Sequence, residues 1–142
     1  MIKILLLVFS ALLLFAQPLT NENFPRYKKL APEVLDIMNN KTNHIVTCFK
    51  KEKSYNNINE CISISGQPIE ALITSLIPEQ TDKLCIKDLN GKLGFVWSEK
   101  NYQILISTLE KTIHRNNANK KCLKHSKTVE EYAKCLVKSK AS

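Results

Sequence analysis

Apolar residues recur every three or four positions along much of this chain, the spacing expected of helices with one buried face. Proline is well tolerated at a first helical position, so the first apolar stripe predicts a helix from Pro32 to Glu52. A short second stripe covers 58–64. A third begins at Pro68 and stops before Pro78, because proline interrupts the helical hydrogen-bond ladder.

Two further stripes lie in the C-terminal half of the chain. Ser98 is a suitable N-cap, and the apolar residues after it at helical spacing are Tyr102, Leu105, Ile106, Leu109 and Ile113. The polar run 114–121 is expected to end this helix. A last helix opens at Thr128, where a hydroxyl residue followed by Glu131 forms a capping box.

The stretch from Leu84 to Trp97 has two interpretations. It can complete a fourth helix that closes at Asn90-Gly91 and is followed by an extended piece, which the helical surroundings favour slightly. It can instead form a β-hairpin, because Asn-Gly between apolar runs is a strong turn signal. The predicted fold is therefore mainly all-α: a small disulfide-stabilised bundle of four to five helices, with a short β-hairpin near 84–97 as the open alternative.

The N-terminus has the pattern of a secretory signal peptide. Lys3 precedes an uncharged apolar stretch from Ile4 to Ala16, which is too short for a typical membrane-spanning helix. We expect cleavage after Ala16 and a secreted, extracellular mature protein. Residues 17–26 are polar and include Pro18 and Pro25. We expect 17–31 to be a flexible N-terminal segment, followed by a single helical disulfide-containing domain over 32–140.

Five cysteines follow the signal-like segment, and in an oxidising compartment most should pair. Cys48 and Cys61 enclose twelve residues, as do Cys122 and Cys135, and the two segments share lysines and a hydroxyl residue at matching places. This repeat suggests two helical hairpins, closed by Cys48–Cys61 and Cys122–Cys135. Cys85 would then be unpaired or would link two chains into a dimer; the alternative pairs Cys85 with Cys48 or Cys61.

Net charge is +8, and its distribution is uneven. Residues 17–99 contain ten basic and ten acidic side chains, whereas residues 100–142 contain ten and three. Such an excess attracts anionic partners, although many basic runs are only solvated faces. The expected contact residues are Arg115, Lys120, Lys121, Lys124, Lys127 and Lys134. We expect Lys28, Lys29, Lys50 and Lys51 to matter less.

The residues that could carry catalysis show no catalytic pattern. His44, His114 and His125 are scattered, no Gly-rich phosphate loop is present, and the cysteines lack zinc-ligand spacing. A thiol–imidazole pair of Cys85 with a histidine is conceivable, but a structural cysteine fits an exported protein better. We therefore expect a non-enzymatic protein without metal or cofactor. Asn40 begins an Asn-Lys-Thr glycosylation sequon.

Two function classes remain for such a chain. The leading hypothesis is a secreted signal or carrier that binds an extracellular protein or an anionic surface, either glycan or lipid headgroups, with no specific nucleic acid expected. The alternative is a cationic, toxin-like effector that acts on anionic membranes or glycans. An effector of that kind needs an amphipathic basic helix. The lysines concentrate instead beside the predicted Cys122–Cys135 hairpin, which favours recognition.

Overall fold

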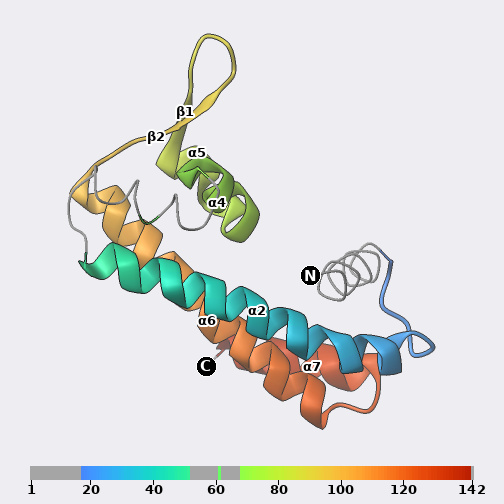
Figure 1. Ribbon diagram of the computed structural model, residues 1–142. Coiled ribbons are helices and arrows are strands. Elements are labelled where there is room, and N and C mark those ends of the chain that lie inside the picture. The colour runs from blue at the N-terminus through green and yellow to red at the C-terminus, as the bar shows by residue number, and fades with distance from the viewer. Residues whose placement is uncertain (1–16, 52–60, 62–67, 142) are drawn as a thin grey trace, which may run out of the picture. The chain divides into compact units, whose positions relative to one another are not determined.

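The computed structural model describes residues 17–51, 61 and 68–141. Their elements in chain order (Figure 1) are α2 (Phe24–Lys51), α4 (Ile69–Leu76), the 3-10 helix η1 (Pro78–Gln80), α5 (Thr81–Leu84), β1 (Cys85–Lys87), β2 (Leu93–Phe95), α6 (Glu99–His125) and α7 (Val129–Ala141). The protein is mainly α-helical and contains two disulfides, as the sequence predicts. The predicted signal peptide and most of the predicted helix over 58–64 lie outside the described residues.

Helix α2 begins at Phe24, well before the predicted start at Pro32. The sequence suggests a flexible segment over 17–31, whereas the structure places its second half in this helix. The reason is burial: Phe24 and Ala31 are almost fully shielded, and the Phe24 ring lies 5.7 Å from that of Tyr132. Contacts with residues far along the chain therefore extend the helix beyond its local signals.

A compact turn closes the N-terminal end of α2. The Thr20 amide donates to Asn23 Oδ1 at 2.8 Å, and the Asn23 amide donates to Thr20 Oγ1 at 3.4 Å. The Phe24 amide donates to the Thr20 carbonyl at 2.9 Å. These bonds satisfy backbone donors that the first helical turn leaves without partners.

Helix α6 is continuous from Glu99 to His125, so the polar run 114–121 does not end it as predicted. Asn116, within this run, is buried and hydrogen-bonded, and Cys122 and Leu123 beyond it are buried as well. At the start of the helix, the Asn101 amide donates to Ser98 Oγ at 3.0 Å, which is the predicted cap. Buried polar contacts, which periodicity does not reveal, carry the helix through its polar middle.

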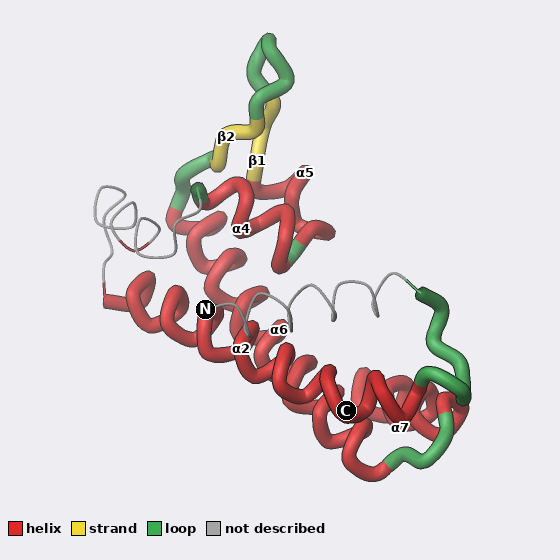
Figure 2. Tube along the Cα trace, turned by 45° about the vertical axis from the view of Figure 1, so that its right-hand side comes forward, coloured by secondary structure: helices red, strands yellow, loops and turns green. Residues whose placement is uncertain are grey.

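The stretch near 84–97 forms a hairpin, the less favoured of the two interpretations. Strands β1 and β2 pair antiparallel, and Figure 2 shows the loop that joins them. Asp88 Oδ1 accepts the amides of Asn90 and Lys92 at 2.8 and 2.9 Å. Gly91 has φ of +77°, a conformation that glycine adopts without strain. Local turn chemistry therefore outweighs the helical surroundings.

The chain divides into two compact units. Among the described residues, unit 1 comprises 17–39 and 115–141, and unit 2 comprises 40–51, 61 and 68–114. Each has its own apolar cluster. Helical periodicity shows which residues are buried but not which stripes pack together, so this division is invisible in the sequence.

Unit 1 contains the first part of α2, the last part of α6, and α7. Its buried cluster consists of Phe24, Ala31, Leu35, Cys122, Leu123 and Tyr132. The predicted cap of α7 is present, because the Glu131 amide donates to Thr128 Oγ1 at 3.2 Å. The Glu131 carboxylate accepts the Lys127 amide at 2.7 Å, and Asn21 Oδ1 accepts the Val129 amide at 2.9 Å.

Unit 2 contains the remaining parts of α2 and α6 with α4, η1, α5 and the hairpin. Its fully shielded side chains include Phe49, Ile73, Ile77, Leu84, Leu105 and Leu109. The Tyr102 hydroxyl donates to the Phe49 carbonyl, and the Phe95 amide donates to Glu70 Oε1 at 2.9 Å. These bonds connect α2 to α6 and α4 to β2 around one core.

Each unit contains one disulfide. Cys122 is bonded to Cys135 in unit 1, with Cα atoms 5.6 Å apart, and Cys48 is bonded to Cys61 in unit 2, with Cα atoms 5.7 Å apart. This is the pairing that the equal spacing predicts. Cys85 is a free thiol and is buried in the unit 2 cluster. A disulfide from Cys85 to a second chain would therefore require unit 2 to open.

Candidate anion-binding site

A surface hollow of about 530 Å³ on unit 1 gathers basic side chains from two helices. Its lining residues are Lys28, Pro32, Lys120, Lys121, Lys124 and His125. Residues four apart on a helix share a face, which places Lys28 with Pro32 on α2 and Lys120 with Lys124 on α6. Three of the six predicted anion-contact residues, Lys120, Lys121 and Lys124, are therefore brought together here.

Lys28 reaches from α2 to the C-terminal end of α6. Its Nζ donates to the Ser126 carbonyl at 2.8 Å, in a partly buried position. Ser126 also donates its amide to the Cys122 carbonyl at 3.0 Å and its hydroxyl to the same carbonyl at 2.7 Å. A cation at a helix C-terminus is favourable because the last carbonyls carry partial negative charge. Lys28 thus has a structural bond besides lining the hollow.

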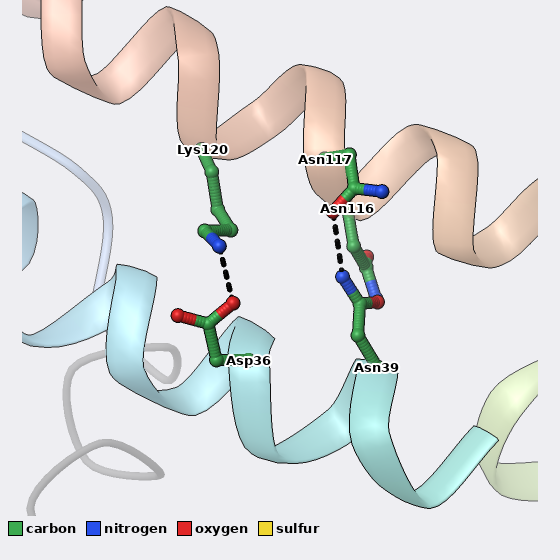
Figure 3. Close-up of polar contacts among 5 residues, drawn as sticks. All are labelled: Asp36, Asn39, Asn116, Asn117 and Lys120. Atoms are coloured by element: carbon green, nitrogen blue, oxygen red, sulfur yellow. Dashed lines mark hydrogen bonds and ion pairs between the residues drawn. The ribbon is translucent and has the colours of Figure 1, made fainter. Parts of the chain in front are cut away.

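Lys120 forms an ion pair with Asp36 of α2 (Figure 3). Both side chains are partly exposed, so water and salt screen the attraction and its contribution to stability is small. The pair nevertheless offsets part of the charge of Lys120. It also holds this lysine against α2 at one side of the hollow.

Buried asparagines align the same two helices beside this ion pair. Figure 3 shows Asn39 of α2 facing Asn116 and Asn117 of α6. Asn116 Nδ2 donates to Asn39 Oδ1, and Asn39 Nδ2 donates to Asn117 Oδ1, both at 2.9 Å. The double contact uses both ends of the Asn39 amide, so it fixes the register of α2 against α6 and with it the spacing of the lysines.

Lys121 and Lys124 are the lysines best placed to bind an anion. Both are exposed, and within the described part of the chain neither forms an ion pair. No carboxylate of the described residues therefore pairs with either ammonium group and competes with a ligand. The hollow therefore presents two available cations beside two that are already engaged.

The other three predicted contact residues do not line this hollow. Arg115 is exposed on α6, Lys127 is exposed in the loop before α7, and Lys134 is exposed on α7. Lys28, which the sequence placed among the less important lysines, does line it. Sequence reasoning also passed over His125, although its position directly after Lys124 was a usable signal. Lys50, another lysine expected to matter less, pairs with Glu110 in unit 2.

The candidate catalytic residues lie on different elements of the structure. His44 and His114 are exposed on helices, whereas Cys85 is buried on β1. Desolvation and the nearby Glu70 carboxylate raise the pKa of the Cys85 thiol, which disfavours the reactive thiolate. Among residues 17–51, 61 and 68–141, no cluster of three or more His, Cys, Asp or Glu side chains could hold a metal ion.

Two further sequence features can be placed on the structure. Asn40, the candidate glycosylation residue, is exposed on α2, while Thr42 of the same sequon is buried. Within the described ranges, no helix combines the length and apolar character needed to cross a membrane.

Comparison with known proteins gives no relative from which a function could be transferred. No family model matches the chain, and no curated protein or solved structure matches it. Functional inference therefore rests on the chemistry of the described residues.

Proposed function

We propose that this protein is a secreted, non-enzymatic binding protein that captures an anionic extracellular ligand in the hollow on unit 1. The observation that carries the proposal is the convergence of Lys28, Lys120, Lys121 and Lys124 from two helices on one hollow. Lys121 and Lys124 form no ion pair within the described chain and are free to contact an anion.

The chemistry of the hollow suits a sulfate, phosphate or carboxylate group. Lysine ammonium groups are compact, mobile cations with three donors each, and they bind such anions as point charges. Pro32 and the lysine stems supply apolar surface beneath the charges. A ligand held in this way would be recognised mainly by charge, so its affinity should fall steeply with ionic strength.

Secretion is part of the proposal. It is supported by the basic and apolar N-terminal sequence that ends at Ala16. Two disulfides point the same way, because such bonds persist in oxidising compartments. The non-enzymatic assignment is supported by the burial of Cys85, which shields its thiol, while His44 and His114 are exposed on helices.

The decisive experiment compares two charge-reversed variants in calorimetric titrations with heparin as the probe. Lys121→Glu/Lys124→Glu should weaken binding by about tenfold or more, as expected for the loss of roughly 1.4 kcal/mol. The matched control is Lys29→Glu/Lys41→Glu, which makes the same change in net charge at two exposed positions of α2 outside the hollow. Equal losses in the two variants would show that only net charge matters and would refute the proposed site.

A second candidate function, action on anionic membranes, is favoured by one feature of unit 2. Ile86 and Leu89 of the hairpin are large apolar residues that are strongly exposed, at 67% and 105%, and Lys87 and Lys92 lie close in sequence. Exposed apolar side chains can enter the bilayer surface while neighbouring lysines contact anionic headgroups. Dye release from phosphatidylserine-containing vesicles that disappears with Leu89→Ser would move this function ahead of ligand capture.

A further inference from the structure

A second basic hollow, of about 480 Å³, lies on unit 2. It is formed by one face of α6 together with η1 and α5, and its lining residues are Gln80, Lys83, Lys100, Gln103, Ile104, Ser107, Thr108 and Lys111. The α6 members follow one another at intervals of three or four positions, with two adjacent pairs, which places them on one side of the helix. One side of α6 therefore forms most of the lining.

Cations and neutral donors are combined in this second hollow. Lys83, Lys100 and Lys111 are exposed, and none of them forms an ion pair within the described part of the chain. Gln103 Nε2 donates to Glu99 Oε1 at 2.9 Å, so Gln103 is held in place along the helix. Ser107 adds an exposed hydroxyl. Ammonium, amide and hydroxyl donors together suit sulfate groups and the sugar hydroxyls between them.

Neither hollow has the lining expected for single-stranded nucleic acid or for bilayer insertion. Among the described residues, no Phe, Tyr or Trp side chain lines either hollow, whereas proteins that bind single strands stack bases on such rings. Within the described ranges, the apolar lining consists of Pro32 in the first hollow and Ile104 in the second, apart from the stems of long polar side chains. A hydrophilic polyanion fits both hollows better.

We propose that the ligand is a linear, highly sulfated polysaccharide that one protein molecule binds at both hollows. This inference rests on the proposed function, which concerns the first hollow alone. The two hollows belong to separate units of one polypeptide. Once one hollow holds the polysaccharide, binding at the other hollow is intramolecular, so the overall affinity exceeds that of either hollow alone. Sulfate groups repeated along the polymer would meet the lysines of each unit independently.

Heparin fragments of increasing length test this inference with the full chain. A short fragment should bind at two sites on each protein molecule, and long heparin should bind about a hundredfold more tightly than the short fragment, within the range that bivalency gives. Lys100→Glu/Lys111→Glu should remove most of this dependence on length while leaving one short-fragment site. The neutral variant Lys100→Gln/Lys111→Gln should reduce the dependence of affinity on fragment length to a smaller extent. The control Lys29→Glu/Lys41→Glu should retain both short-fragment sites.

The outcomes separate the two proposals. If Lys100→Glu/Lys111→Glu binds long heparin like the Lys29→Glu/Lys41→Glu control, while Lys121→Glu/Lys124→Glu loses binding, the second hollow is not a site and the proposed function stands. If all three variants behave alike, both proposals fail. Tighter binding to a single-stranded oligonucleotide of matched charge, or to phosphatidylserine vesicles, would overturn the assignment to a sulfated polysaccharide.

Discussion

Asn39 Oδ1 accepts a hydrogen bond from Asn116 Nδ2 at 2.9 Å, and both side chains are about 6% exposed. Asn39 also donates to Asn117, so the amide is bonded at both its oxygen and its nitrogen. A buried amide is costly unless its partners are present, which means that only one register of α2 against α6 satisfies this pair. The relationship therefore specifies how the two helices meet in unit 1.

Replacing Asn39 by alanine should lower the free energy of unfolding by about 1–3 kcal/mol, because Asn116 is left buried without its acceptor. Urea unfolding followed by far-ultraviolet circular dichroism measures the loss. The neighbouring exposed residue provides the control: Asn40→Ala should change stability by less than about 0.5 kcal/mol. Equal effects of the two substitutions would contradict the bond, and the double variant Asn39→Ala/Asn116→Ala should be less destabilised than the sum of its parts.

The separate cores predict local effects of cavity-forming substitutions. Leu105 in unit 2 and Leu123 in unit 1 are fully shielded, and either Leu→Ala change should cost about 2–5 kcal/mol. The single tryptophan, Trp97, packs against the unit 2 core, so its fluorescence should report the Leu105 variant more directly than the Leu123 variant. Val137→Ala, at a position that is 69% exposed, is the control. Identical fluorescence transitions for both core variants would show that the units unfold together.

Cys85 should resist alkylation in the folded protein. Burial raises the pKa of its thiol and shields the sulfur, so reaction with iodoacetamide at neutral pH requires opening of unit 2. Labelling followed by mass spectrometry should show little modification until denaturant is added. Leu89→Cys in a Cys85→Ser background, at a fully exposed position, should react at the rate of a free thiol. Rapid labelling of Cys85 under native conditions would contradict its burial and revive the disulfide-linked dimer.

Unit 1 should lose stability in alkali. Burial, more than its contact with Tyr27, raises the pKa of Tyr132 well above the ordinary value of about 10. Above that pH the unfolded chain loses a phenolic proton that the folded chain retains, so the free energy of unfolding falls as pH rises. Tyr132→Phe should lower stability at neutral pH by about 1 kcal/mol, since the 3.0 Å bond to Asn119 is lost.

The same Tyr132→Phe variant should show a weaker decline in stability above pH about 10, because the titrating group is gone. Urea midpoints measured on both sides of that pH, together with tyrosinate absorbance, test the difference. A variant that declines as steeply as the unmodified protein would show that other groups, such as the buried Tyr102, cause the alkaline loss.

Local signals predict much of this fold and distant contacts account for the rest. Ser98 and Thr128 act as the caps that their chemistry suggests, and the spacing of the four paired cysteines matches their bonds. The early start of α2 could not be foreseen, because it depends on Phe24 meeting Tyr132 from the other end of the chain. Asn116 is a polar residue of the kind that often ends a helix, and only its buried bond to Asn39 explains why α6 continues through it.

Some residues of the candidate site could likewise be predicted from the sequence, and others only from the fold. Lys120, Lys121 and Lys124 lie within five positions of one another in the sequence, so their grouping was predicted, although the helix α6 that carries them was expected to end within 114–121. Lys28 joins them only because α2 packs beside α6, and its bonding partner Ser126 is 98 residues away in sequence. The second hollow could not be predicted for a related reason: Lys83 belongs to the charge-balanced stretch, whereas Lys100 and Lys111 lie in the basic one, and only the fold brings them together.

The two disulfides also bear on how the chain acquires its bonds. Each joins cysteines 13 positions apart, and each pair lies within a single unit. Short loops close with less entropy loss than long ones, so these partners meet more often than any pairing between the units. Once unit 2 has packed, Cys85 is shielded from thiol exchange. Oxidation during synthesis could therefore reach the final connectivity directly, without a disulfide isomerase to correct mispaired intermediates.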